Sequence, residues 1–475
     1  MKYQSTQGFM PYFTFEDTLY NGWLQNNGLI VPVCVPRLTN DELLKFCNLS
    51  YKEVCLKILS LFIDSDFISD VELKAIIEKA VSIFPENVAP FKELYPGAYI
   101  LELFHGPTHS FKDLSLSLVG PLLNHSLEKN GKCGIVYVCT SGDTGSAAIH
   151  VMKNQPNLHT IVMFPDGNRI SKLQRQLITS VNHKNIHTFS ADCSCDDFDF
   201  FNQKEFIPNL KKRYPDIVVT SLNSLLWSRI LAQMCHIVYA YCNTSFNLQP
   251  LRIVIPTGGA GHLTSAVLVQ KLGFPILIVA ASNDKNPNLH NFLSGQSMSK
   301  TSSVKQSFTV AMDIQFPCNL DRLLYFWSDG CTDTVKKIMD SFYSGIPTKA
   351  DQKLLEKIQE SVTPMSVNDD DVIATIKRCY EETQYILDPH TALGFSLHYQ
   401  NKVDNYPTVY CGCASPIKFV DTLYKAEIPV PKYFTEYVYN KELNVEYCHA
   451  CPPKKEDWCN YLLDYISDKI SESFK

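Results

Sequence analysis

The first 97 residues carry apolar side chains at helical spacing. Between residues 70 and 84, charged positions separate apolar ones that fall on one face of a helix: Val71, Leu73, Ile76, Ile77, Ala80 and Ile83. The pattern predicts a mainly helical N-terminal region.

From residue 98 onward, short apolar runs alternate with longer amphipathic stretches. The runs are typical of buried strands, at 98–104, 134–139, 160–165, 251–256, 275–280 and 407–412. The stretches that follow them are typical of helices, at 145–153, 171–182, 224–242 and 261–272. This alternation predicts an α/β protein whose parallel sheets are covered by helices on both faces.

The chain has 475 residues, which is long for one core, so we expect more than one domain. We place an N-terminal region at 1–97, a core at 98–430 and a C-terminal tail with a helix at 431–475. Within the core, a smaller subdomain covers roughly 125–240 and a larger one the remainder. A Ser-, Gly- and Lys-rich stretch at 294–307 predicts a surface loop, and helices are expected from 321 to 384 with a break near 345–347.

The amino-acid composition limits the kinds of partner that we expect. The net charge is -6, which disfavours nucleic acids and anionic membranes, since both attract a basic face. The 17 cysteines, a start without an apolar leader, and the lack of a run of roughly 18 apolar residues favour a cytoplasmic protein with reduced thiols. We expect a small-molecule substrate and a monomer or homodimer.

Two groups of residues have the side chains of metal ligands. Cys448, His449, Cys451 and Cys459 lack a clear second ligand pair, and the other group combines His183 and His187 with Cys193 and Cys195. We therefore predict no metal site.

Lys112 is the most informative residue for chemistry. It follows a predicted strand and the Gly106-Pro107 turn, and Phe111 precedes it. A lysine in a dry pocket has a lowered pKa and becomes a nucleophile, which suits Schiff-base chemistry. Taken alone, Lys112 fits an ordinary solvated helix-start lysine better, and the motifs that follow reverse this interpretation.

Two loops join predicted strands to helices. Residues 140–145, Thr-Ser-Gly-Asp-Thr-Gly, offer hydroxyls and backbone amides to a carboxylate or phosphate, although plain helix capping explains them too. Residues 257–262, Thr-Gly-Gly-Ala-Gly-His, allow the backbone to wrap closely around a phosphate, or form only a glycine-rich turn. The glycine spacing fits neither a P-loop nor a dinucleotide fingerprint, which argues against a nicotinamide-dependent oxidoreductase.

A reactive lysine, an anion loop and a phosphate cradle together are the requirements of a pyridoxal phosphate site. On these motifs the chain resembles the threonine synthase family of fold-type II pyridoxal phosphate enzymes, and more narrowly its animal threonine synthase-like 2 branch. The likeness runs from residues 1–8 through 105–113, 140–145 and 223–229 to 311–315 and 388–392. It implies a tryptophan synthase beta-like core of two doubly wound parallel-sheet domains.

The resemblance also implies residue roles. Lys112 would bond covalently to the cofactor, and Asp143 would lie near its 3-hydroxyl group. The cofactor phosphate would be held by Thr257, Gly258, Gly259, Ala260 and Gly261, and the substrate carboxylate by Thr140, Ser141 and Thr144. Asn223, Ser224 and Arg229 would lie beside the substrate, with Arg229 on its phosphate group.

Three departures from the family pattern bear on the reaction. Cys413 stands where the family has a threonine facing the pyridine nitrogen, and it is a weaker hydrogen-bond partner. Leu226 replaces a frequent asparagine, and Ser415 replaces a histidine, which we interpret as weakening the polar pocket that adds water.

We therefore predict a lyase that removes phosphate from O-phosphohomoserine or O-phosphothreonine to give 2-oxobutyrate and ammonia. Conversion of O-phosphoserine to pyruvate is a further candidate reaction. A phospho-lyase activity is also what the resemblance to threonine synthase-like 2 proteins implies. One alternative is a threonine synthase; another is a cofactor-binding interaction protein with weak catalysis.

Overall fold

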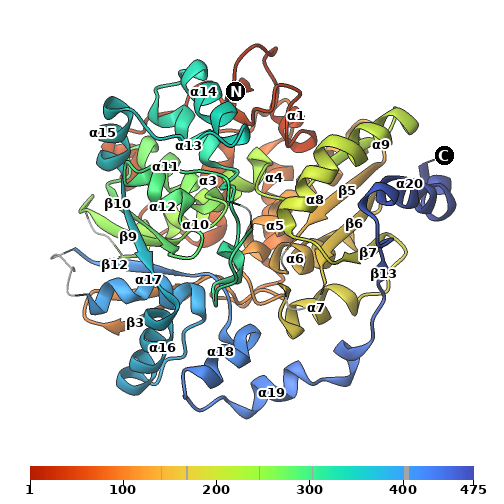
Figure 1. Ribbon diagram of the computed structural model, residues 1–475. Coiled ribbons are helices and arrows are strands. Elements are labelled where there is room, and N and C mark those ends of the chain that lie inside the picture. Colours follow the sequence, from red (N-terminus) through yellow and green to blue (C-terminus); the bar gives the residue numbers. More distant parts are fainter. Residues whose placement is uncertain (141, 167–168, 245–246, 302, 401–405, 475) are drawn as a thin grey trace.

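Two β-sheets, each with helices on both faces, form the core of the protein (Figure 1). The structure is a computed structural model that describes residues 1–140, 142–166, 169–244, 247–301, 303–400 and 406–474. No helix in these ranges is both long and apolar enough to cross a membrane.

The larger sheet has six strands in the order β11-β10-β9-β12-β4-β3. All neighbours run parallel except β3, which pairs antiparallel with β4. The strands are β3 (Phe91–Tyr95), β4 (Ala98–Glu102), β9 (Leu251–Pro256), β10 (Ile276–Asn283), β11 (Val362–Val367) and β12 (Thr408–Gly412).

The smaller sheet has five parallel strands in the order β13-β7-β6-β5-β8. The strands are β5 (Gly134–Cys139), β6 (Leu158–Pro165), β7 (Ile186–Ala191), β8 (Val218–Ser221) and β13 (His449–Ala450). The last of these comes from the C-terminal segment, which therefore extends the edge of this sheet.

Alternating side chains divide each sheet between two layers. In β9, Ile253 and Ile255 join the central core under helices α10 and α11, whereas Val254 joins a second core under α16 and α17. In β5, Val136 joins the central core, whereas Ile135 joins a third core under α8, α9 and α20. Successive side chains of a strand point to opposite faces, so continuous apolar runs are what two-sided burial requires.

The helices that cover the sheets follow the strands in chain order. They are α5 (Lys112–Lys129), α6 (Asp143–Met152), α7 (Lys172–Thr179), α8 (Cys195–Phe201), α9 (Ile207–Arg213), α10 (Trp227–Thr244), α11 (Gly261–Leu272), α12 (Asn288–Leu293), α13 (Leu320–Trp327), α14 (Thr332–Tyr343), α15 (Gln352–Ser361), α16 (Asp369–Thr383), α17 (Pro389–Tyr399), α18 (Val420–Lys425), α19 (Lys432–Val438) and α20 (Trp458–Lys469).

The N-terminal region packs on the helices of the core. It consists of β1 (Tyr3–Ser5), β2 (Ile30–Pro32), α1 (Phe15–Tyr20), α2 (Asn40–Leu44), α3 (Tyr51–Ser60) and α4 (Asp70–Val81). Capping boxes begin all four helices, and α3 and α4 pack against α10 and α5.

The C-terminal segment spans the two halves of the molecule. In Figure 1 it passes below the sheets through α18 and α19 and then rises to β13 and α20. Trp458 and Leu462 of α20 are buried in the third core. The domain boundaries expected at 97 and 430 stay predictions.

Each of the six expected strand segments contains a strand, but the expected helix over 321–384 is wrong in one part. Residues Val362–Val367 form β11 and pair in parallel with β10. Because β11 is an edge strand, Pro364 within it loses no essential ladder hydrogen bond. Strands β3, β7, β8 and β13 were likewise not predicted from the sequence.

Candidate active site

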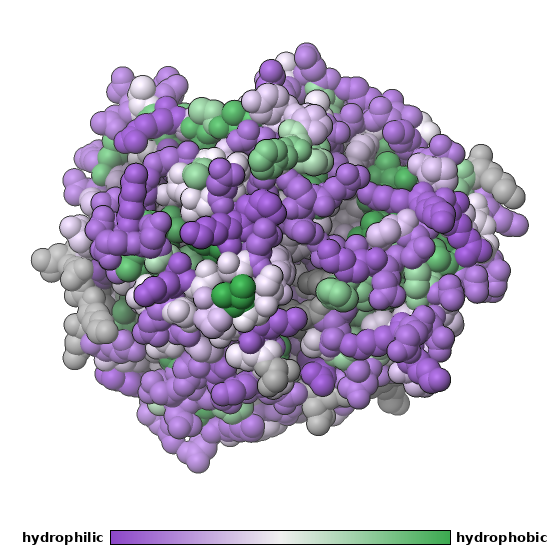
Figure 2. Space-filling model, turned by 45° about the horizontal axis from the view of Figure 1, so that its top comes forward, coloured by the Kyte–Doolittle hydropathy of each residue, from purple (hydrophilic) through white to green (hydrophobic). Residues whose placement is uncertain are grey.

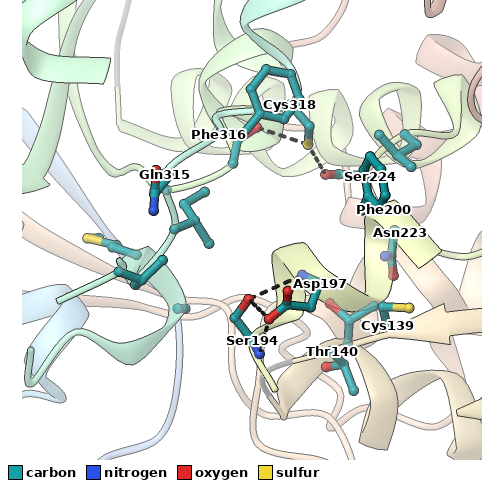
Figure 3. Close-up of a pocket in the computed structure, with 18 of the residues that line it drawn as sticks. Cys139, Thr140, Ser194, Asp197, Phe200, Asn223, Ser224, Gln315, Phe316 and Cys318 are labelled. Carbon is teal, nitrogen blue, oxygen red and sulfur yellow. Dashed lines mark hydrogen bonds between the residues drawn. The ribbon is translucent and has the colours of Figure 1, made fainter. Parts of the chain in front are cut away.

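The carboxyl ends of β4, β5, β9 and β12 all lead into loops that border one cleft, whose volume is about 2200 Å³. Ligands of open α/β sheets bind at such ends. In Figure 2 the face shown is mostly hydrophilic and is hollowed near its centre. Figure 3 shows Thr140 and Asn223 on one wall of a pocket and Phe316 and Cys318 on the facing wall.

Lys112 begins α5 and extends into this cleft. Its Nζ donates a hydrogen bond to Oδ2 of Asp143 at 3.1 Å, and it lies 4.6 Å from the centre of the Phe111 ring. The side chain is only 15% exposed. Lys112 is therefore largely shielded from solvent, and its amine faces the cleft.

Asp143, at the start of α6, accepts hydrogen bonds from several side chains of the site. Its Oδ1 accepts hydrogen bonds from Lys418 Nζ at 2.8 Å and from Gln174 Nε2 at 2.9 Å. Burial would raise the pKa of this carboxyl, but the charges of Lys418 and Lys112 and these hydrogen bonds outweigh burial and hold the pKa well below its usual value. Asp143 is thus a carboxylate with three partners.

The loop before Lys112 is fixed by Asp113. The backbone N–H of Thr108 donates to Asp113 Oδ2 at 2.9 Å, and the Thr108 hydroxyl donates to Oδ1 at 2.7 Å. A Cβ on Gly106 would lie 2.5 Å from Asp113, so the close approach requires glycine. These contacts hold the start of α5 in place.

The loop after β5 curls around the Thr140 hydroxyl. Its Oγ1 accepts hydrogen bonds from the N–H groups of Gly142 at 2.9 Å and Gly145 at 3.0 Å. Gly142 has φ of 139°, which favours glycine. Thr140 and Thr144 line the cleft, and Ser141 lies outside the described residues.

The loop after β9 is a cradle of bare backbone. A Cβ on Gly258 would lie 2.7 Å from the carbonyl oxygen of Ala311, and Ala260 adopts a left-handed conformation with φ of 61°. No described side chain caps α11, whose first turn therefore presents its N–H groups to the cleft with the positive end of the helix dipole. Thr257, Gly258, Gly259, Ala260 and Gly261 all line the cleft.

Asn319 ties this cradle to the segment expected beside the substrate. Its Nδ2 donates to Gly259 O at 3.2 Å and to Ser224 Oγ at 3.0 Å. Asn223 also lines the cleft, and its buried Oδ1 accepts no hydrogen bond from the described residues. An acceptor of this kind is available to a ligand N–H or O–H.

Arg229 reaches the floor of the cleft from α10. Its Nη1 donates to the carbonyl oxygen of Leu222, while its buried Nε has no partner among the described residues. Burial lowers the pKa of its guanidinium to about 9. Its expected role on the substrate phosphate stays a prediction.

Cys413 follows β12, lines the cleft, and donates a weak hydrogen bond from Sγ to Cys411 O at 3.5 Å. Burial raises the pKa of the Cys413 thiol well above its usual value, so the thiol is neutral. The expectation for Leu226 is wrong: it is buried in the central core, and its neighbour Leu225 lines the cleft. Ser415 caps a short turn and is likewise not among the cleft residues.

The structure thus brings together every described residue that was expected to bind the cofactor or the substrate, whereas Leu226 and Ser415 lie outside the cleft. Sequence reasoning missed Lys418, Gln174 and His262 as members of the cleft or its support. Lys418 stood inside a motif that was compared with the family, and that was the available signal. Gln174 had none, because its contact with Asp143 depends on how α7 packs.

No group of three or more His, Cys, Asp or Glu residues in the described part of the chain is arranged to hold a metal ion. The donors present fit pyridoxal phosphate instead. An aldehyde needs the Lys112 amine, and a dianionic phosphate needs N–H groups at a helix start with no Cβ in the way, as around Gly258.

Comparisons with known proteins agree with this site. Residues 2–81 match the model "Threonine synthase N terminus", and residues 91–406 match the model "Pyridoxal-phosphate dependent enzyme". Threonine synthase-like 2 of Xenopus laevis is 35% identical over 435 residues, which are 90% of this chain and 91% of that protein. Threonine synthase of Pseudomonas aeruginosa is 31% identical over 430 residues, which are 90% of this chain and 91% of that protein.

Among solved structures, pyridoxal-phosphate-bound threonine synthase from Brucella melitensis matches with a TM-score of 0.89 and 26% identity, covering 99% of both chains. The threonine synthase structure from yeast matches with a TM-score of 0.86 and 26% identity, covering 98% of this chain and 99% of that one. These matches confirm the fold class and the cofactor that the sequence analysis predicted.

Proposed function

This chain belongs to the threonine synthase family of pyridoxal-phosphate-dependent enzymes, and we propose that it is a phospho-lyase acting on O-phosphohomoserine or O-phosphothreonine. The products would be 2-oxobutyrate, ammonia and phosphate, with one water consumed. The observation that carries the proposal is the meeting of Lys112, Asp143 and the Gly258 cradle in one cleft.

Pyridoxal phosphate, when bound, supplies an electron sink that stabilises negative charge on Cα of an amino acid. The residues of the chain supply position and proton transfer. The N–H groups of the glycine loop would hold the cofactor phosphate, and the loop at Thr140 and Thr144 would hold the substrate carboxylate.

Lys112 is the group placed to move protons. Its Nζ, once neutral, would take the proton from the substrate Cα, and Asp143 beside it stays a carboxylate throughout. In O-phosphothreonine the phosphate is on Cβ and leaves directly. In O-phosphohomoserine a second proton must leave Cβ before the γ-phosphate departs.

The cleft wall favours elimination over water addition. Adding water at Cβ requires polar groups that hold and orient it, whereas elimination requires only that the leaving phosphate be bound. Besides its polar groups, the cleft lining contains thiols and apolar side chains, as Figure 3 shows in part: Cys139, Phe200, Leu225, Phe316 and Cys318. The neutral Cys413 thiol adds no charge to the bound cofactor.

Product analysis tests the proposal. Purified protein loaded with pyridoxal phosphate is incubated with each phospho-amino acid, and phosphate, 2-oxobutyrate and threonine are quantified. We expect phosphate and 2-oxobutyrate in equal amounts, and no turnover by Lys112→Ala. Mostly threonine would identify a synthase instead. Phosphate release no faster than with free cofactor would favour the binding-protein alternative.

A further inference from the structure

Lys418 is a buried lysine that the proposed reaction does not use. It lies in a short 3-10 turn (Pro416–Phe419), and its side chain is 0% exposed. Its Nζ donates to the carbonyl oxygen of Thr108 at 2.7 Å and to Asp143 Oδ1 at 2.8 Å. Burying an ammonium is costly unless it is paired, so these two contacts account for its place in the interior.

Both acceptors of Lys418 belong to segments that position Lys112. Thr108 lies in the loop that Asp113 fixes just before α5, and Asp143 accepts the hydrogen bond of Lys112 on its other oxygen, Oδ2. Two lysines therefore share one carboxylate, with one on each oxygen. Lys418 also joins the end of β12 to the starts of α5 and α6.

This sharing matters because the two lysines have different tasks. Lys112 must lose its proton before its amine can attack an aldehyde, and it loses its ammonium charge when it does so. A lone carboxylate next to it would favour the charged form and oppose that loss. A second lysine on the same carboxylate offsets this attraction and leaves Asp143 paired after Lys112 becomes neutral.

We propose that Lys418 is a positioning residue that pairs with Asp143 from its other oxygen and thereby releases Lys112 to bind the cofactor. The inference rests on the family cofactor and not on the lyase outcome. The other ionisable groups around the two lysines are His109 in the preceding loop, Asp113 on α5, His262 on α11, Asp388 before α17 and Cys413 after β12.

These neighbours do not replace the charge of Lys418. Burial, with the nearby charge of Lys418, lowers the pKa of His109 to about 4, and burial, with Lys112, lowers that of His262 to about 3. Both imidazoles are therefore neutral at pH 7. Gln174, which also donates a hydrogen bond to Asp143, is an uncharged amide.

The test measures cofactor attachment without any substrate. Cofactor-free protein is mixed with pyridoxal phosphate over a range of pH, treated with borohydride, and assayed by mass spectrometry for the fraction modified at Lys112. In Lys418→Met, Lys112 is the one lysine that still contacts the Asp143 carboxylate. The pH midpoint of cofactor attachment should therefore rise by about 1–3 units. Lys418→Arg keeps the charge and should stay near the unaltered protein.

Two further variants complete the design. Lys285→Met removes an ion pair with Asp369, 2.6 Å long, outside the cleft, and should leave the midpoint unchanged. The double variant Asp143→Asn/Lys418→Met removes the buried carboxylate together with the cation paired to it, so it carries the test if Lys418→Met does not fold. Its midpoint should lie at or below that of the unaltered protein. An unchanged midpoint in folded Lys418→Met, or a raised midpoint in the double variant, would overturn the inference.

Discussion

Nζ of Lys112 donates a hydrogen bond to Oδ2 of Asp143 across 3.1 Å, although 31 positions separate the two residues in the chain. Lys112 begins α5 and Asp143 begins α6, so two helix starts, each following a parallel strand, converge at this contact. The proposed chemistry depends on this contact between a largely buried lysine and a carboxylate that other residues hold in place.

Adjacent glycines in the cradle should respond differently to alanine. A Cβ at position 258 would press on backbone, 2.7 Å from Ala311 O, whereas a Cβ at 259 would meet Cys318 Sγ at an ordinary 3.6 Å. We expect Gly258→Ala to destabilise the cofactor-free protein by about 2 kcal/mol and Gly259→Ala to change it little. Urea unfolding of both variants checks this, and equal losses would refute it.

A buried carboxyl outside the cleft should give the protein a measurable pH dependence. Asp321 accepts hydrogen bonds from Thr6 and Gln7, and burial raises its pKa to about 6. Between about pH 4 and 6 the Asp321 carboxyl binds more protons in the folded state than in the unfolded state, so its contribution to the free energy of unfolding falls as the pH rises, by about 3 kcal/mol in total.

Asp321→Asn should flatten this slope, as measured by unfolding at a series of pH values. Asp370→Asn on the exposed start of α16 serves as the control and should leave the slope unchanged. An identical slope in Asp321→Asn would show that this carboxyl does not set the pH dependence.

Arg322 should stabilise the fold through the hydrogen bonds of its guanidinium and not through its positive charge alone. The fully buried guanidinium donates to Ile30 O at 3.0 Å, Ser224 O at 2.9 Å and Asn319 Oδ1 at 2.7 Å, and also to Leu225 O. Lysine cannot reach all four acceptors, and each orphaned buried acceptor costs about 1–3 kcal/mol.

We therefore expect Arg322→Lys to lower the free energy of unfolding by about 3 kcal/mol. The matched change Arg378→Lys, in an exposed pair with Glu382 on α16, should have little effect. Chemical denaturation of both variants measures the two free energies of unfolding. Equal stability of the two variants would contradict the stabilising role of the Arg322 hydrogen bonds.

The apolar wall of the cleft should control the product. Leu225→Asn combined with Cys413→Thr adds polar groups where the cleft now has a Leu side chain and a neutral thiol. We expect the ratio of threonine to 2-oxobutyrate to rise from O-phosphohomoserine. Leu226→Asn, buried in the core, should lower stability without changing that ratio. An unchanged ratio of threonine to 2-oxobutyrate in all variants would show that these side chains do not determine the product.

Local patterns were enough to predict much of this structure. Continuous apolar runs marked β5 and β9, and the loops at Thr140 and Gly258 were recognisable because backbone chemistry alone constrains them. By contrast, β11 contains a proline and β13 has two residues, so neither carries a strand signal of its own. Both form because a neighbouring strand offers them a partner.

Contacts between distant segments could not be predicted in the same way. Lys418 reaches Asp143 across 275 positions, and only tertiary packing decides which side chain fills that space. Leu225 and Leu226 are equally apolar in sequence, and the turn before α10 determines which of them faces the cleft. Motifs identified the chemistry, whereas the support around it required the fold.

The proposed chemistry requires that Lys112 carry the cofactor. Borohydride reduction of the protein with bound pyridoxal phosphate, followed by peptide mapping by mass spectrometry, tests it directly. We predict one reduced adduct per chain, on the peptide that contains Lys112, and its loss in Lys112→Ala. An adduct on another lysine, with Lys112 unmodified, would show that Lys112 does not carry the cofactor.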